Sequence, residues 1–299
     1  LLANYGESFT VLTRTGRGKF GLGLELIKRD IELVKFCRKF KPDVLTGISG
    51  YFIAHAGKLV GKPVIVWDDT EHQSLGHKIT WPFSTEIQNP DCYLKKNNKK
   101  QIFYPGTHEL AYLTPGYFAP DKNIVKEAGI NPDERYCLIR LVSWQAHHDI
   151  GQHGLEKSGL TGFLNEISRY ASPYLSIEGN SPDSLKPYRL NAPVQNIHHI
   201  MALSSLCITE GATMASESAV LGVPAIYINT LSAGTIRAFE KNGMLYHITD
   251  TGKALKQALK ILKDPDSQKT YQDRIKRFLE NKIDVTEYVV STIEKYAAD

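Results

Sequence analysis

The sequence of 299 residues is poor in cysteine and in long apolar runs. Its four cysteines, spread from Cys37 to Cys207, are too few and too far apart for a disulfide framework or a CxxC metal site. Three of them fall in apolar patterns, which indicates buried thiols in a reducing compartment. No run approaches the roughly 18 apolar residues of a membrane-spanning helix. We therefore expect no integral membrane segment and a location in the cytoplasm, or peripherally at the inner membrane surface.

An excess of charge of one sign is also missing, since 36 basic residues face 32 acidic ones and leave a net charge of +4. This excludes the clustered basic surface typical of nucleic-acid binding. The densest basic run, Lys95–Lys100, is most simply a solvated turn before a strand, and weak attraction for anionic substrates or a membrane surface is the alternative. With 42% apolar and 10% aromatic residues, the chain is globular and not disordered.

What the sequence does contain is an alternation of short apolar runs and amphipathic helical patterns. The run Val64–Trp67 is apolar at every position, as in strands of parallel sheets that are buried on both faces. The same alternation restarts in the second half, which predicts two doubly wound α/β domains. A segment rich in Pro and Gly, 113–135, places the boundary between residues 1–118 and 119–283, and a C-terminal helix at 284–299 could join the first domain.

The beginning of the sequence resembles the inside of a fold. Leu1–Gly6 reads as the last turn of a helix with its C-cap glycine, and Phe9–Leu12 as a strand. We therefore expect a first strand–helix unit of the N-terminal domain to be absent from this sequence.

Ionisable residues follow the strand predicted at Val64–Trp67, at the sheet edge where α/β proteins bind ligands. Asp69, Glu71 and His72 could act there as a general base for an acceptor hydroxyl or as a proton shuttle. His108 follows a later strand near the expected domain hinge and is a further catalytic candidate. Capping of the next helix by surface polar groups is the alternative for the first three.

The loop after the strand predicted at Cys137–Val142 is rich in histidine. His148 and Asp149 are candidates for acid–base catalysis, because histidine exchanges protons near neutral pH. A metal site is less favoured, since His147 and His148 are adjacent and point apart. A polar loop that caps the next helix remains an alternative, and we predict neither a metal nor an obligate cofactor.

In the segment Cys207–Ala225, a strand ends in small residues directly before a helical pattern. Gly211, Ala212 and Thr213 would let the free N–H groups of a helix N-terminus approach an anion, to which the helix dipole adds attraction. Glu217 lies one turn further on and could accept hydrogen bonds from two sugar hydroxyls. The spacing fits a phosphate-binding turn, and it fits equally a strand–helix turn that needs small residues only for packing.

This segment, with its Leu-Gly-x-Pro ending, resembles the donor-site motif of GT-B-fold proteins. These include the non-hydrolysing UDP-N-acetylglucosamine 2-epimerases and inverting UDP-sugar glycosyltransferases. Glu210 and Gly211 stand where the epimerases have Asp-Ser, and one Glu of their pair is missing, which disfavours epimerase chemistry. The resemblance implies a nucleotide-sugar site formed by Ser143, Trp144, His147, Glu178, Gly179, Ile197, His198, Gly211, Ala212, Thr213 and Glu217.

Further motifs resemble a prokaryotic domain-of-unknown-function family, number 354, over essentially the whole chain. They are Asp69–His72, Gly106–Leu113, Ser143–Asp149, Ile197–His199 and Thr213–Glu217. The resemblance implies a GT-B-like fold of two Rossmann-type domains that face a cleft.

Three functions are compatible with this resemblance. The first is an inverting glycosyltransferase of cell-envelope or polysaccharide synthesis, with a UDP-activated N-acetylhexosamine as donor and a lipid or glycan as acceptor. The second is a UDP-sugar 2-epimerase or hydrolase, and the third a non-catalytic nucleotide-sugar-binding protein. The sequence leaves the oligomeric state open, with a homodimer among the alternatives.

Overall fold

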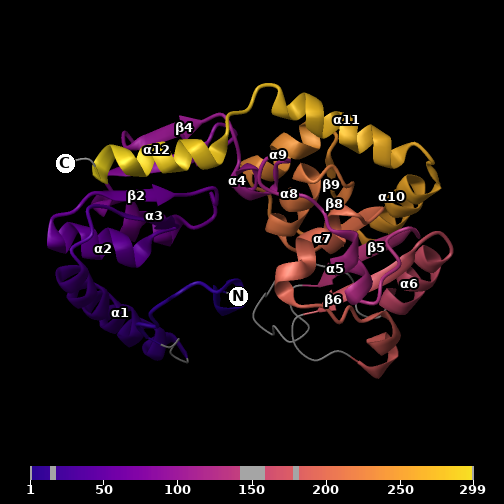
Figure 1. Ribbon diagram of the computed structural model, residues 1–299, viewed down its shortest axis with the longest axis horizontal. Coiled ribbons are helices and arrows are strands. Elements are labelled where there is room, and N and C mark those ends of the chain that lie inside the picture. The colour runs from indigo at the N-terminus through magenta and orange to yellow at the C-terminus, as the bar shows by residue number, and fades with distance from the viewer. Residues whose placement is uncertain (1, 14–17, 142–158, 178–181, 298–299) are drawn as a thin grey trace. The chain divides into compact units, whose positions relative to one another are not determined.

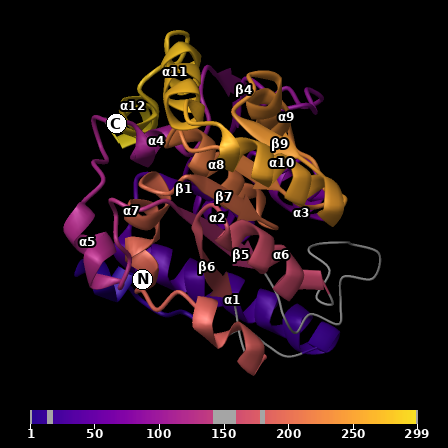
Figure 2. The same ribbon diagram turned by 90° about the vertical axis from the view of Figure 1, so that its right-hand side faces the viewer.

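The computed structural model describes residues 2–13, 18–141, 159–177 and 182–297. It divides the chain into two compact units (Figures 1 and 2). Unit 1 consists of residues 1–108 and 283–299, and unit 2 of residues 109–282. Each unit holds one sheet of parallel strands with helices between the strands, which confirms the predicted α/β class.

Unit 1 is built on a sheet with the strand order β1-β2-β3-β4. Its elements are η1 (Leu2–Tyr5), α1 (Gly18–Phe40), β1 (Leu45–Ile48), α2 (Tyr51–Val60), β2 (Val64–Trp67), α3 (Ser74–Thr80), η2 (Trp81–Phe83), β3 (Glu86–Pro90), β4 (Gln101–Tyr104) and α12 (Val285–Ala297). All four residues of β2 are buried, as its unbroken apolar run predicts. Cys37, Ala54 and Val66 belong to the core that α1 and α2 form with β1 and β2.

The last helix of the chain belongs to the first unit. In Figure 1, α12 lies against the strands of unit 1, to which the chain returns after residue 282. The hydroxyl of Tyr288 donates to Oε1 of the buried Gln88 at 2.8 Å, and that of Tyr296 donates to Glu86 at 2.6 Å. The polar side chains of β3 are thus satisfied by residues about 200 positions away.

Two details of unit 1 differ from the sequence prediction. Phe9–Leu12 forms no strand, and Phe9 and Val11 are 55% and 67% exposed, because no described strand pairs with this segment. Conversely, β3 was not predicted, because its sequence Glu-Ile-Gln-Asn-Pro is largely polar.

Unit 2 has five parallel strands in the order β6-β5-β7-β8-β9. Its elements are α4 (Leu110–Leu113), α5 (Lys122–Glu127), β5 (Tyr136–Leu141), α6 (Leu160–Ser168), β6 (Ser172–Ile177), η4 (Asp183–Tyr188), η5 (Val194–Asn196), α7 (Ile197–Ala202), β7 (Leu206–Thr209), α8 (Ala212–Val220), β8 (Ala225–Tyr227), α9 (Gly234–Lys241), β9 (Leu245–His247), α10 (Thr251–Lys263) and α11 (Ser267–Leu279). The side chains of β7 and β8 are buried throughout, and α6 and α10 contribute to the main core.

Helix α8 packs closely because most of its residues are small. Every residue from Ala215 to Val220 is buried. The helix ends at Gly222, whose φ of +70° is the left-handed conformation that glycine adopts without strain. The N–H groups of Gly222 and Val223 donate to the carbonyls of Ala219 and Ser218, which is the hydrogen-bond pattern of a Schellman cap. The Leu-Gly-x-Pro motif is therefore explained locally by the end of this helix.

None of the helices in the described part of the chain combines the length and apolar character required to cross a membrane.

The contact between α2 and β2 gives a first prediction. A Cβ atom built on Gly57 would lie 2.2 Å from Cγ2 of Val64, a stiff side chain in a buried strand. We expect Gly57→Ala to lower the free energy of unfolding of unit 1 by about 1–3 kcal/mol through overpacking, measured by urea denaturation.

Gly162→Ala in α6 is the matched control, because a Cβ at Gly162 meets no atom within 4 Å. The control should leave stability unchanged or raise it by up to about 1 kcal/mol, since alanine is the better helix former. Equal loss in the two variants would contradict the packing explanation.

Candidate functional site

The strand order of unit 2 places a ligand site at one point of its sheet. The chain passes from β5 to β6 on one side and then to β7 on the other, so the direction of winding changes between β5 and β7. Open α/β sheets bind ligands in the crevice at the carboxyl ends of the strands that flank such a switch point. Arg140, near the end of β5, is in register with Thr209, the last residue of β7.

The turn between β7 and α8 is held in place by its neighbours. The N–H of Gly211 donates to Oγ1 of Thr209 at 3.0 Å, and that of Glu210 to the carbonyl of Arg140 at 3.2 Å. From the other side, Nδ2 of Asn229 donates to the carbonyl of Glu210 at 3.0 Å, and the ring of His247 bonds the carbonyl of Asn229. Because this turn is fixed, the N-terminus of α8 lies at the switch point.

The first turn of α8 suits an anion. Gly211 is its N-cap, no described side chain caps it, and its first turn contains no acidic residue. The first N–H groups of a helix lack partners within the helix and carry the positive end of its dipole. Gly211, Ala212 and Thr213 are partly or largely accessible, so an anion could reach these groups.

Glu217, on the second turn of α8, is 7% exposed and held at one oxygen. Its Oε1 accepts from the hydroxyl of Tyr112 at 3.0 Å and lies 3.0 Å from Nε2 of His198. In the described part of the chain, Oε2 has no hydrogen-bond partner. The carboxylate is therefore oriented by two side chains while one acceptor oxygen remains available.

Aromatic rings surround the two adjacent histidines of α7. The ring of His198 lies 5.8 Å from that of Tyr112, and the rings of Phe118 and His199 lie 4.9 Å apart. The N–H of Asp121 donates to Nδ1 of His199 at 3.0 Å, which requires this nitrogen to be unprotonated. Burial lowers the pKa of His199, the charge of His198 lowers it further, and that of Asp121 opposes the change. His199 is thus a structural histidine that stays neutral at pH 7.

A second cluster lies at the end of β2 in unit 1. Oδ2 of Asp69 is 3.3 Å from Nδ1 of His108, whose ring stacks on that of Tyr104. Burial raises the pKa of Asp69, but the hydrogen bond and charge of His108, together with the hydroxyl of Thr70, outweigh it and hold the pKa below its ordinary value. Asp69 is therefore an ionised carboxylate that lies beside an imidazole.

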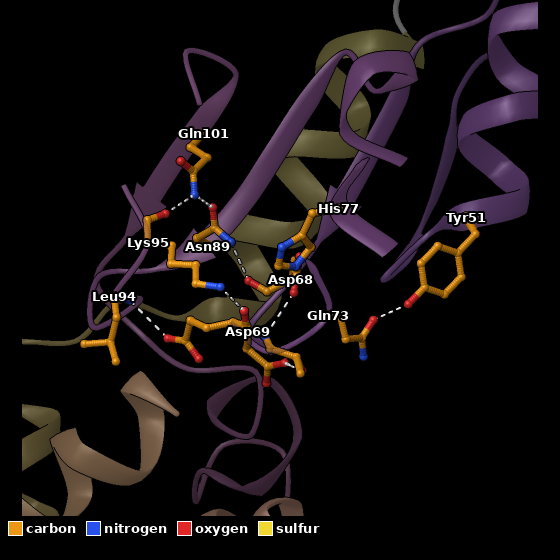
Figure 3. A network of polar contacts seen from close by, with 11 residues as sticks. Tyr51, Asp68, Asp69, Gln73, His77, Asn89, Leu94, Lys95 and Gln101 are labelled. Carbon is orange, nitrogen blue, oxygen red and sulfur yellow. Dashed lines mark hydrogen bonds and ion pairs between the residues drawn. The ribbon is translucent and has the colours of Figure 1, made fainter. Parts of the chain in front are cut away.

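The neighbouring Asp68 has a different environment (Figure 3). It is 3% exposed, and its Oδ2 lies 2.8 Å from Nε2 of His77. Burial raises the pKa of Asp68, and the charge of Asp69 adds to this, while the N–H of Thr70 and the charge of His77 oppose it. Asp68 thus points into the unit and fixes the ring of His77, rather than facing a substrate with Asp69.

The other catalytic candidates of unit 1, Glu71 and His72, have different surroundings from each other. Glu71 is buried, and its Oε1 accepts from the N–H of Leu94 at 3.0 Å, so it supports the 91–100 connection. His72 is exposed in the turn before α3. The structure brings together only Asp69 and His108 of the candidates in this unit that it describes.

Some of the site candidates predicted in unit 2 lie in the described part of the chain, and the others do not. Ile197 and His198 open α7, and Gly211, Ala212, Thr213 and Glu217 are at the start of α8. Ser143, Trp144, His147, His148, Asp149, Glu178 and Gly179 lie outside the described residues. His198 and Glu217 are in contact, as a shared site requires.

Three residues of these clusters were not singled out in the sequence. Arg140 interrupts an apolar strand, and its guanidinium donates to Oγ of Ser176 at 2.7 Å. Tyr112 belongs to the Gly106–Leu113 motif, but its contact with Glu217 spans 105 positions. His77 stands one helical turn inside α3. Of the three, only Arg140 could have been found from the sequence, because a charged residue inside an apolar strand is unusual.

Each of the two units is an α/β arrangement of parallel strands and helices. The fold is that of the GT-B proteins, and solved structures of this kind match almost the whole chain. The family described as "Protein of unknown function (DUF354)" matches residues 1–293, and the chain belongs to it. This confirms the family resemblance stated from the sequence motifs.

One curated relative and two solved structures illustrate the range of similar proteins. The relative is the UDP-N-acetylglucosamine–N-acetylmuramyl-(pentapeptide) pyrophosphoryl-undecaprenol N-acetylglucosamine transferase of Halothermothrix orenii. The chain is 23% identical to it over 280 aligned residues, and the match covers 86% of this chain and 71% of the relative. The UDP-GlcNAc 2-epimerase of Neisseria meningitidis bound to UDP-GlcNAc has a TM-score of 0.66 and 13% identity, with 98% of this chain and 86% of that chain covered.

The second structure is a glycosyltransferase, SsfS6 of Streptomyces sp. SF2575, complexed with thymidine diphosphate. It has a TM-score of 0.55 and 11% identity, with 89% of this chain and 74% of that chain covered. Epimerases and glycosyltransferases are thus both similar in fold.

The pair of Asp69 and His108 gives the second prediction. His108→Gln keeps a polar side chain but removes the charge, so we expect the pKa of Asp69 to rise. Carboxyl ¹³C NMR titration measures it. His55→Gln, which alters a different histidine–aspartate pair of unit 1, should leave the titration of Asp69 unchanged. If the pKa of Asp69 were unchanged in His108→Gln, the imidazole would not be what holds this carboxylate ionised.

His199 gives a third prediction, on stability against pH. Because its folded pKa lies below its ordinary 6.5, the unfolded chain binds the proton more readily. The stabilisation is complete above pH 6.5 and is lost as the pH falls through the folded pKa. We expect the difference in unfolding free energy between wild type and His199→Ala to shrink between pH 7.5 and pH 5. A difference that grows on acidification would contradict this assignment.

Proposed function

We propose that the protein is a nucleotide-sugar-dependent enzyme, an inverting glycosyltransferase that uses a UDP-activated N-acetylhexosamine. The single observation that carries the proposal is the carboxylate of Glu217, which is buried and oriented by Tyr112 and His198 with Oε2 available. A carboxylate held in this way, one turn from a helix N-terminus, is suited to accept hydrogen bonds from a ribose diol while the helix holds a diphosphate.

The charges around the switch point support a diphosphate. The first turn of α8 presents its dipole, and Arg140 adds a full positive charge in the adjacent strand. Arginine suits phosphate because its planar guanidinium can donate two parallel hydrogen bonds. Ile197 and His198, at the start of α7, would then border the base of the nucleotide.

For the transfer step, Asp69 is the proposed general base. It would accept the proton of the acceptor hydroxyl, the oxygen would attack C1 of the sugar, and the bond from C1 to the diphosphate would break to release UDP. The lowered pKa of Asp69 keeps the carboxylate ionised, and His108 would stabilise that charge. The acceptor we propose is a lipid or glycan of cell-envelope or polysaccharide synthesis, in line with the transferase relative.

A second candidate is a UDP-sugar 2-epimerase or hydrolase. The similarity in fold to UDP-GlcNAc 2-epimerases favours it, and Asp69 with His108 could move a proton at C2 of the sugar. Against it stand Glu210 and Gly211 at the positions where the epimerases have Asp-Ser.

The nucleotide site is tested by calorimetry with UDP and UDP-N-acetylglucosamine. We expect micromolar binding that weakens at least tenfold in Glu217→Gln, which removes the charge with little change in shape. Glu166→Gln is the control, because Glu166 is a partly exposed residue of α6 and pairs only with Arg169 among the described residues. If no nucleotide binds to the wild type, or if the two variants bind alike, the proposed site is wrong.

The two reactions are separated by their products. Deuterium uptake at C2 of the sugar in heavy water, with no acceptor present, would identify the epimerase. A glycosylated product that forms only after an acceptor lipid or glycan is added would identify the transferase, and Asp69→Asn should abolish it while binding of UDP persists.

A further inference from the structure

Unit 1 contains a cavity of about 350 Å³ that is lined by His77, the neighbour of Asp68, but by neither Asp69 nor His108. One wall comes from α3 and η2, and the other from the connection between β3 and β4. Among the residues that line it, Lys78, Lys95 and His77 are basic and none is acidic. Asn97 and Asn98 add amide groups.

The wall formed by α3 and η2 is rigid. The imidazole of His77 stacks on the indole of Trp81 with ring centroids 4.2 Å apart and an angle of 18° between the planes. Its Nε2 lies 2.8 Å from Oδ2 of the buried Asp68, close enough for an ion pair when the ring is protonated. Figure 3 shows His77 and Asp68 in the polar network that also includes Lys95 and Gln101. The ring is therefore held in one orientation before any ligand arrives.

The opposite wall is also fixed, although it contains the basic run of the sequence. Oε1 of Gln101 accepts from the N–H groups of Asn97 and Asn98 at 2.9 Å each, and Nε2 of Gln101 donates to the carbonyl of Lys95. Nζ of Lys100 donates to the carbonyls of Trp81, Pro82 and Ser84, which ties the connection to η2. The run is thus a solvent-exposed turn before β4, as the sequence predicts, and its backbone is held in place by Gln101 and Lys100.

Lys95 is positioned to hold an anion. Its Nζ donates to the carbonyl of Glu71 at 2.6 Å, and because an ammonium group has three N–H donors, two remain for a ligand. Lys78, on α3, brings a second positive charge to the same cavity. Two lysines that line a concave surface, with no carboxylate among the lining residues, raise the local concentration of anions.

We propose that this cavity binds a small phosphate-bearing molecule, with Lys78 and Lys95 holding the phosphate and the fixed ring of His77 beside it. The volume is near the lower end of the roughly 300–1,000 Å³ of small-molecule sites, which suits a monosaccharide phosphate and not a whole nucleotide sugar. The proposal goes beyond the nucleotide-sugar site of unit 2, because every residue that carries it belongs to unit 1.

The test is calorimetry of the full chain at low ionic strength with glucose 1-phosphate as the probe. We expect saturable binding that inorganic phosphate displaces and that glucose does not. The double variant Lys78→Ala/Lys95→Ala should bind at least tenfold more weakly. Lys96→Ala/Lys99→Ala removes the same charge from the same connection but from outside the cavity, and it should bind within twofold of the wild type.

Three results would overturn the proposal: no binding to the wild type, an equal loss in both double variants, or binding that persists in Lys78→Ala/Lys95→Ala. The outcome is independent of the proposed function. Glu217→Gln should leave the affinity for glucose 1-phosphate unchanged, and saturating UDP should not displace it. Loss of binding in Glu217→Gln would place the probe in unit 2 and contradict the assignment.

Discussion

The burial of parallel strands on both faces is the constraint on which the rest of this structure depends. Strands such as β2 and β7 have no solvent-facing side, so neither face can carry an exposed polar side chain. Polar groups therefore gather where the strands end, at Asp68 and Asp69 after β2 and in the turn after β7. Exposed ionisable side chains are therefore excluded from these strands and lie at their ends.

The same constraint separates two adjacent carboxylates. Asp68 turns into the unit, where burial raises its pKa and its role is to hold His77. Asp69 has a pKa held below its ordinary value by His108. One position along the chain thus decides between a carboxyl group buried beside His77 and a carboxylate held ionised by His108, and no local feature of the sequence Asp-Asp-Thr distinguishes them.

Much of the fold could be predicted from the sequence because apolar runs and helical periodicity report burial directly, as in Val64–Trp67 and Leu206–Thr209. The failures have one cause: neighbours distant in sequence. The polar strand β3 is stable because Tyr288 and Tyr296 satisfy it, and Phe9–Leu12 is no strand because nothing described pairs with it. Likewise, Glu217 was predicted from its spacing, whereas its partner Tyr112 could not be.

The return of α12 to unit 1 has a consequence for synthesis on the ribosome. Unit 2 is continuous in sequence, so its residues 109–282 can fold as soon as they emerge. Unit 1 begins before unit 2 in the sequence but is completed after it, because the buried Gln88 and the partly buried Glu86 of β3 bind two tyrosines of α12. Until α12 has been synthesised and has packed back onto unit 1, the polar strand β3 lacks these two partners.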